Sequence, residues 1–159
     1  MQFLSSQECE KWLHDRQRGL PHESLETPAE RIPFPTEPYR YFFFARWIAK
    51  SLTFELPALL WIKEWEIWPN SENWHLYYTL RQSNHTTDLL EKSPGHLFLG
   101  YETEALCSFL QLAMLNGWDG YLLTQADHVN LFFSHDEYID FFGRNYDLGE
   151  ILKALGSHR

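Results

Sequence analysis

The clearest alternation of apolar and polar residues runs through two stretches, 59–68 and 74–82. In each stretch successive side chains fall into two sets with a spacing of two, which is typical of a β-strand with two different faces. Residues 69–73 between them read Pro-Asn-Ser-Glu-Asn, a composition that favours a turn. The pattern therefore predicts an antiparallel hairpin. The hairpin contains four tryptophans in a stretch of 14 residues, which indicates either a thick core or a binding surface.

A helical spacing of apolar residues is found in other parts of the chain. Residues 103–116 carry apolar side chains at every third or fourth position, and Gly117 follows where helices commonly end. Residues 39–52 predict a second helix by the same spacing. The sequence Ser-Ser-Gln-Glu that starts at Ser5 fits a capping box. We therefore expect a further helix that begins at Ser5 and ends at Gly19.

The remaining patterns predict shorter elements. Strands are expected at 96–101, 120–125 and 129–134, and the last two form a second hairpin. Capping signals predict three more helical segments. They run from Thr86 or Thr87 to Lys92, from a capping box at Ser134–Glu137 to Phe142, and from Leu148 to Leu155.

Together these elements predict a single α/β (α+β) domain over residues 1–159. The unit of strand 96–101, helix 103–116 and strand 120–125 is a candidate βαβ crossover, with parallel strands and a right-handed connection. With the two hairpins it gives a mixed sheet of about five strands with helices packed on it. Residues 20–38 hold five of the eight prolines and are expected to form an extended segment within the domain.

Cysteine content and hydropathy bear on the compartment. Cys9 and Cys107 are far apart in a chain long enough to build a core, so buried free thiols in a reducing compartment are expected. Residues 1–20 contain no continuous apolar run of the secretory type. The longest uncharged run has 14 residues, whereas a helix needs about 20 to span a bilayer. We therefore expect a cytoplasmic protein without a membrane partner.

The net charge of −9 is unevenly distributed. Residues 1–58 carry −1 and residues 59–159 carry −8. An acidic surface repels phosphate backbones and attracts basic proteins, so we expect no nucleic acid and a basic protein partner. Ordinary solubility is the plain alternative explanation. The candidate binding residues of this acidic stretch are Asp119, Asp127, Asp136 and Asp140, and the last two would share a face of the predicted helix.

Aromatic residues supply the other candidates for binding. On the helix predicted at 39–52, Phe43 and Trp47 fall on the same flank as the cation Arg46. This flank is expected to carry exposed aromatic rings beside cations. Trp118 stands between a helix end and a strand, where an indole either anchors a partner at the surface or plugs the end of the core. The plug is favoured.

No motif for catalysis, metal binding or cofactor binding is recognised. The eight histidines lack metal-ligand spacing, and the glycines are scattered at element ends rather than gathered in a phosphate-binding or dinucleotide-binding loop. We therefore expect no catalytic residue, no metal and no cofactor. His75 and His96 lie on separate predicted strands and could converge, although His75 fits better on a polar face of the sheet.

An enzyme would need another arrangement. His128 and His135 bracket one predicted strand and would have to meet Asp119 and Asp136 at a common edge of the sheet. Seven residues of straight strand separate the two histidines by about 23 Å, which disfavours a shared site.

The sequence therefore favours a non-enzymatic protein-binding module for a basic partner, of the adaptor or immunity-protein type that inhibits a cationic toxin. The alternative is a small His/Asp-dependent hydrolase or a metal-dependent enzyme. Convergence of two or more histidines in one cleft would favour the enzyme.

Overall fold

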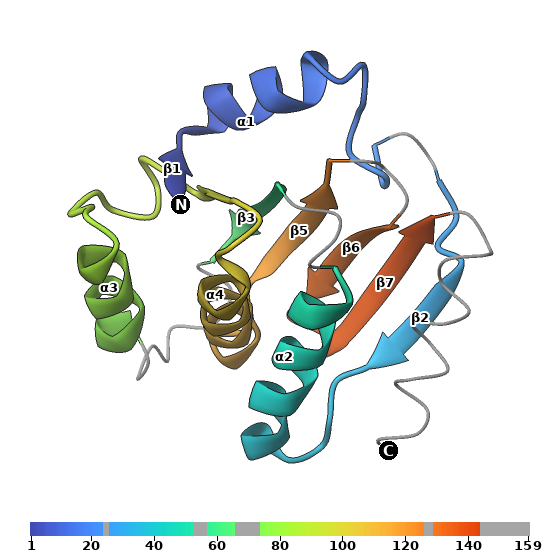
Figure 1. The fold of residues 1–159 in the computed structure, drawn as a ribbon. Helices are drawn as coiled ribbons and strands as arrows, with labels where there is room; N and C mark the ends of the chain where they lie inside the picture. The colour runs from blue at the N-terminus through green and yellow to red at the C-terminus, as the bar shows by residue number, and fades with distance from the viewer. Residues whose placement is uncertain (24–25, 53–56, 66–73, 126–128, 144–159) are drawn as a thin grey trace.

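Seven strands form one sheet in the computed structural model, which describes residues 1–23, 26–52, 57–65, 74–125 and 129–143 (Figure 1). Their order is β1-β4-β3-β5-β6-β7-β2, and every neighbouring pair is antiparallel. The strands are β1 (Gln2–Leu4), β2 (Glu30–Pro33), β3 (Ala58–Glu64), β4 (Gly95–Phe98), β5 (Asp119–Thr124), β6 (Val129–Ser134) and β7 (Tyr138–Gly143).

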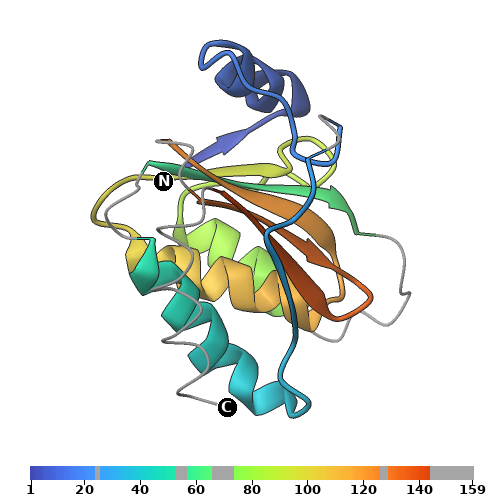
Figure 2. The ribbon, with the colours of Figure 1, turned by 90° about the vertical axis from the view of Figure 1, so that its right-hand side faces the viewer.

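The α-helices of the described residues cover the two faces of the sheet unequally. On one face lie α2 (Tyr41–Ser51), α3 (Trp74–Ser83) and α4 (Thr103–Leu115), and on the other lies α1 (Ser6–His14) (Figure 2). Alternate residues of a strand point to opposite faces. Leu60 and Leu122 consequently belong to the core under α2 and α4, whereas Leu59 and Leu123 pack in the smaller core under α1.

The α/β class is confirmed, but the sheet has seven strands rather than about five, and its neighbouring strands are all antiparallel rather than mixed. β1 and β2 are short edge strands that the pattern did not reveal, and β2 lies inside the proline-rich segment 20–38. The crossover unit consists of β4, α4 and β5. Both strands are antiparallel to β3, which lies between them, so they run in the same direction without being neighbours.

Several predicted elements are confirmed. The Ser5 side chain accepts from the Glu8 amide and the Glu8 carboxylate accepts from the Ser5 amide, which completes the capping box of α1. This helix ends at His14, earlier than the Gly19 expected from the sequence. The helices predicted at 39–52 and 103–116 correspond to α2 and α4, and β5 and β6 are paired as a hairpin.

The prediction that residues 74–82 form the second strand of the tryptophan hairpin is wrong, because residues Trp74–Ser83 form α3. The segment fits both periodicities, and the alternation of Leu76, Tyr78 and Leu80 favours a period of two. Its buried residues are Tyr77 and Arg81, which lie one helical turn apart, whereas Leu76 is exposed. Because arginine does not count as apolar, the pattern of apolar residues does not reveal the helical face that Tyr77 and Arg81 share.

The helix predicted from Ser134 to Phe142 is also wrong. Ser134 and Tyr138 are paired at the end of a hairpin between β6 and β7, and Glu137 has a positive φ of 62° in the intervening turn. The Ser134 hydroxyl accepts from the Asp136 amide at 3.2 Å. A serine can bond nearby amides in a turn as well as at a helix start, so the capping signal did not discriminate between them.

Residues 86–92 do not form the predicted helix: residues 86–89 have no regular secondary structure and residues 90–92 form a turn. The segment Leu148–Leu155 lies outside the described residues, as do Asp127 and His128. Among the described residues no helix has the length and apolar character needed to cross a bilayer.

Candidate interaction site

Two strands and one turn bring acidic side chains together at one end of the sheet. Glu64 at the end of β3 is paired with Asp119 at the start of β5. The carboxylate of Asp119 accepts from the amide of His135 at 2.6 Å, and its Oδ1 lies 2.8 Å from His135 Nδ1. Asp136 Oδ1 lies 3.6 Å from the other ring nitrogen of His135. We name Glu64, Asp119, Asp136 and Glu137 the acidic rim.

Like charges stand opposite each other in this rim. Carboxylates directly across a strand pair repel, and Glu64 and Asp119 are such a pair. The hydrogen bond to Asp119 raises the pKa of His135, and the charges of Asp119, Asp136 and Glu64 act in the same direction. Asp119 and Asp136 therefore favour the protonated form of the His135 ring.

Asp140 does not belong to the rim. Its side chain is fully buried on β7, where the Arg31 guanidinium of β2 donates two hydrogen bonds to it at 2.7 and 2.8 Å. This pairing raises the pKa of Arg31. The expectation that Asp136 and Asp140 share one helix face is thus corrected: Asp136 lies in an exposed turn and Asp140 in a strand.

A second polar cluster lies around Asp140. His22, in the segment after α1, has Nδ1 3.1 Å from the Tyr121 hydroxyl and Nε2 3.6 Å from Asp140 Oδ2. Its ring packs edge-on against Phe132 and Phe142, with centroids 4.5 and 5.0 Å away. Burial raises the pKa of Tyr121 to about 12, so its phenol stays protonated at neutral pH. The cluster fastens this segment onto the sheet.

The third polar cluster is sealed in the core beneath α3. Arg81 is fully buried and donates to the Tyr77 hydroxyl at 2.8 Å and to the backbone oxygen and hydroxyl of Ser93. Tyr77 in turn lies 2.7 Å from His96 Nε2. Burial, followed by the charge of Arg81, lowers the pKa of His96 to about 3. This ring is therefore neutral, and solvent cannot reach it.

The structure does not bring His75 and His96 together, because His75 is exposed on α3 and His96 is buried on β4. Of the residues required for the enzyme hypothesis, His135 does meet Asp119 and Asp136. No group of three His, Cys, Asp or Glu side chains able to hold a metal ion occurs in the described part of the chain.

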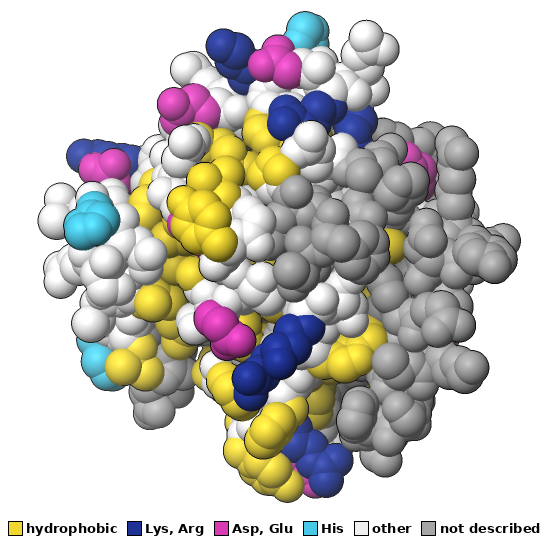
Figure 3. All heavy atoms as spheres, viewed as in Figure 1, with side chains coloured by type: hydrophobic (Ala, Val, Ile, Leu, Met, Phe, Trp, Pro, Cys, Tyr) yellow, Lys and Arg dark blue, Asp and Glu magenta, His cyan; other side chains and the backbone are white. Residues whose placement is uncertain are grey.

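The flank predicted on α2 carries exposed rings. Phe43 is 63% exposed, Tyr39 before the helix 67% and Phe42 38%. The Arg46 guanidinium lies 5.8 Å from the Phe42 ring centroid. Figure 3 shows hydrophobic and basic side chains gathered over this helix at the lower end of the face. We name Tyr39, Phe42, Phe43, Arg46 and Lys50 the aromatic–cationic stripe.

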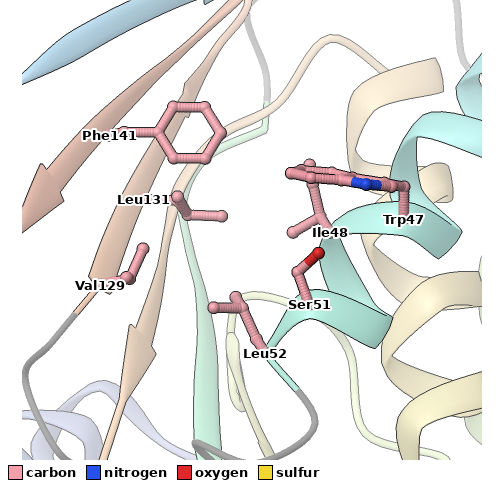
Figure 4. A pocket seen from close by; sticks show the side chains of 7 residues that line it. All are labelled: Trp47, Ile48, Ser51, Leu52, Val129, Leu131 and Phe141. Carbon is pink, nitrogen blue, oxygen red and sulfur yellow. The ribbon is translucent and has the colours of Figure 1, made fainter. Parts of the chain in front are cut away.

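Trp47 is only half-buried but does not stand free beside Phe43. Figure 4 shows its indole over a narrow apolar gap between α2 and strands β6 and β7. The gap has no room for a water molecule, and its other lining residues are Ile48, Ser51, Leu52, Val129, Leu131 and Phe141. Trp47 therefore helps to attach α2 to the sheet.

Trp118 lies in the core rather than at the surface. It is 2% exposed, and its ring centroid lies 4.9 Å from the rings of both Trp74 and Tyr77. The indole closes the space between α3 and the end of α4, as the plug interpretation predicted. In this position it cannot contact a partner.

Two groups of residues were missed by the sequence patterns. Glu64 joins the rim only through its register with Asp119, and Arg81 joins Tyr77 only because α3 is helical. The four-residue spacing of Tyr77 and Arg81 was the available signal for the second group. For Glu64 no local signal existed.

Comparison with known proteins finds no matching family model, no matching curated protein and no matching solved structure.

Proposed function

We propose that this chain is a non-enzymatic protein-binding module that holds a basic partner at its acidic rim. The observation that carries the proposal is that Asp119 and Asp136 both lie against the partly exposed imidazole of His135, with Glu64 paired to Asp119 in the neighbouring strand. These carboxylates come from positions up to 72 residues apart, so the fold itself gathers the negative charge.

The arrangement concentrates negative charge at one end of the sheet. Glu64 and Asp119 oppose each other across the strand pair, and the exposed Asp136 adds a further negative charge nearby. A lysine or arginine from a partner would relieve this repulsion and gain charge-assisted hydrogen bonds. Attraction of this kind acts mainly on the association rate and weakens with added salt.

A short oligolysine peptide is a suitable probe, with binding measured by calorimetry at low salt and at physiological salt. The rim variant Glu64→Gln/Asp136→Asn should weaken binding about three- to tenfold, because each exposed ion pair contributes about 0.2–1 kcal/mol. The matched control is Asp88→Asn/Glu91→Gln, which removes the same charge from two exposed positions between α3 and β4. Equal weakening by both double variants would reduce the effect to net charge and contradict a rim site.

One observation favours the alternative of a small hydrolase. Asp119 orients His135 through Nδ1 at 2.8 Å, as an acid orients a general base, and His135 remains partly exposed. Hydrolysis of simple ester and phosphoester substrates that disappears in His135→Gln and Asp119→Asn would support this function. Activity that survives both substitutions would have another source, and the dyad would then have no catalytic role.

A further inference from the structure

The aromatic–cationic stripe is a second face of a helix whose first face is already packed. Ala45, Ile48 and Ala49 of α2 are buried in the core. The stripe residues follow the helical spacing i, i+3, i+4, i+7 and i+11 on another side. Aromatic rings exposed to this extent in a group mark a surface that another molecule covers.

The stripe is positively charged in a strongly negative chain. Arg46 and Lys50 lie on it and Arg40 beside it, whereas the chain as a whole has a net charge of −9. Glu37 lies 3.3 Å from Arg40, and Glu104 lies 3.9 Å from Arg46 at an exposed position. These two acids balance part of the charge, and an acidic surface is the complement of what remains.

The described residues include such an acidic surface next to the stripe. The amide of Phe34 donates to the carbonyl oxygen of Glu137 in the rim at 2.7 Å, and five residues later the stripe begins at Tyr39. Glu137 also lies close enough to Tyr41 to raise the pKa of its phenol, although burial is the larger cause. Rim and stripe therefore lie side by side at the same end of the sheet.

We propose that two copies of this chain associate about a two-fold axis, with the stripe of each copy against the acidic rim of the other. Two neighbouring surfaces of opposite charge on one molecule are self-complementary under a two-fold rotation, and such a dimer closes. The contact covers Phe42 and Phe43 and places Arg46 near the carboxylates of Glu64 and Asp136. Each copy contributes both halves of the contact.

This inference rests on the proposed function, because it uses the same acidic rim. It adds that a second copy of the chain occupies the rim when no basic partner is bound. A basic partner and the second copy then compete for the rim. Self-association is measured on the pure protein, whereas partner binding is measured with the peptide, so each proposal can fail without the other.

The test is sedimentation equilibrium of the full chain over a wide range of concentrations and at two salt concentrations. The wild-type mass should rise from monomer to dimer, and salt should weaken the association. Phe43→Ser and Asp136→Lys should each weaken it at least about tenfold, since each damages both copies of the contact. An equimolar mixture of the two variants should associate more tightly than either alone, because one stripe and one rim remain intact.

Matched controls are Leu89→Ser, which removes an exposed apolar side chain elsewhere, and Glu91→Lys, which reverses an exposed charge elsewhere. Both should dimerise like the wild type. Thermal unfolding of all variants checks that they are folded.

Two outcomes would overturn the dimer. The first is a protein that stays monomeric at every concentration, whether or not its stripe binds anionic vesicles. The second is a dimer that Phe43→Ser dissociates and Asp136→Lys leaves unaffected, because the stripes of the two copies would then contact each other. If oligolysine binding persists in a strict monomer, only the dimer fails. If the dimer persists and oligolysine does not dissociate it, the basic-partner function fails.

Discussion

The hydroxyl of Tyr77 on α3 donates to Nε2 of His96 on β4 at 2.7 Å, inside the core. Nδ1 of His96 lies 3.3 Å from the Leu60 carbonyl and donates to it. Arg81 donates to the same hydroxyl, so the three side chains form one chain of hydrogen bonds. The network joins a helix to two strands and depends on a neutral imidazole.

Acid should therefore destabilise the protein through His96. Its pKa in the folded protein is lowered from 6.5 to about 3, so below 6.5 the unfolded chain takes up a proton that the folded protein refuses. This contribution to stability is complete above 6.5 and is lost as the pH falls, by about 1.4 kcal/mol per pH unit. Denaturant titrations at several pH values should show a shallower slope for His96→Gln. The exposed His75→Gln is the control, and equal slopes in all three proteins would contradict the assignment.

His135 should titrate in the opposite direction. Its hydrogen bond to Asp119 raises its pKa above 6.5, so its stabilising effect is complete below 6.5 and is lost as the pH rises through the folded pKa. An NMR titration of the His135 ring protons should find a pKa above the ordinary value of 6.5. Asp119→Asn should lower the pKa of His135, because it removes the hydrogen-bonded carboxylate. If Asp119→Asn leaves the pKa of His135 unchanged, the hydrogen bond between Asp119 and His135 is contradicted.

The two acids once expected on one helix face should behave differently. Asp140→Asn should lower the denaturant midpoint clearly, because it weakens the paired hydrogen bonds from Arg31 at a fully buried site. Asp136→Asn should leave the midpoint unchanged, because that side chain is 70% exposed. Equal shifts of the denaturant midpoint in the two variants would contradict the burial of Asp140.

The apolar face of α4 should be sensitive to truncation. Leu110 is fully buried, so Leu110→Ala should cost about 2–5 kcal/mol through lost transfer energy and the cavity left behind. Leu76→Ala is the matched control, because Leu76 on α3 is 48% exposed and should change stability much less. Equal free energies of unfolding for the two variants would show that Leu110 does not pack in the core.

Local chemistry was enough to identify several elements. The capping box at Ser5 and the 3.6-residue spacing in 103–116 each act within a few residues, so the sequence alone predicts α1 and α4. Period-two patterns with turn residues between them likewise predicted β5 and β6. The exposed position of Phe43 followed from its place on α2.

The candidate sites depended on contacts distant in sequence. Arg31 and Asp140 are 109 positions apart, and their pairing turned a predicted surface acid into a buried one. Glu64 reached the rim through strand register, and Arg81 became a core residue through partners on two other segments. Helix spacing and capping are determined by neighbours along the chain, so the sequence by itself determined those elements. Burial of a charge and strand register are determined by residues that only folding brings together. The tertiary structure alone therefore determined which residues form the acidic rim, that the rim lies beside the stripe, and which polar side chains are buried in the core.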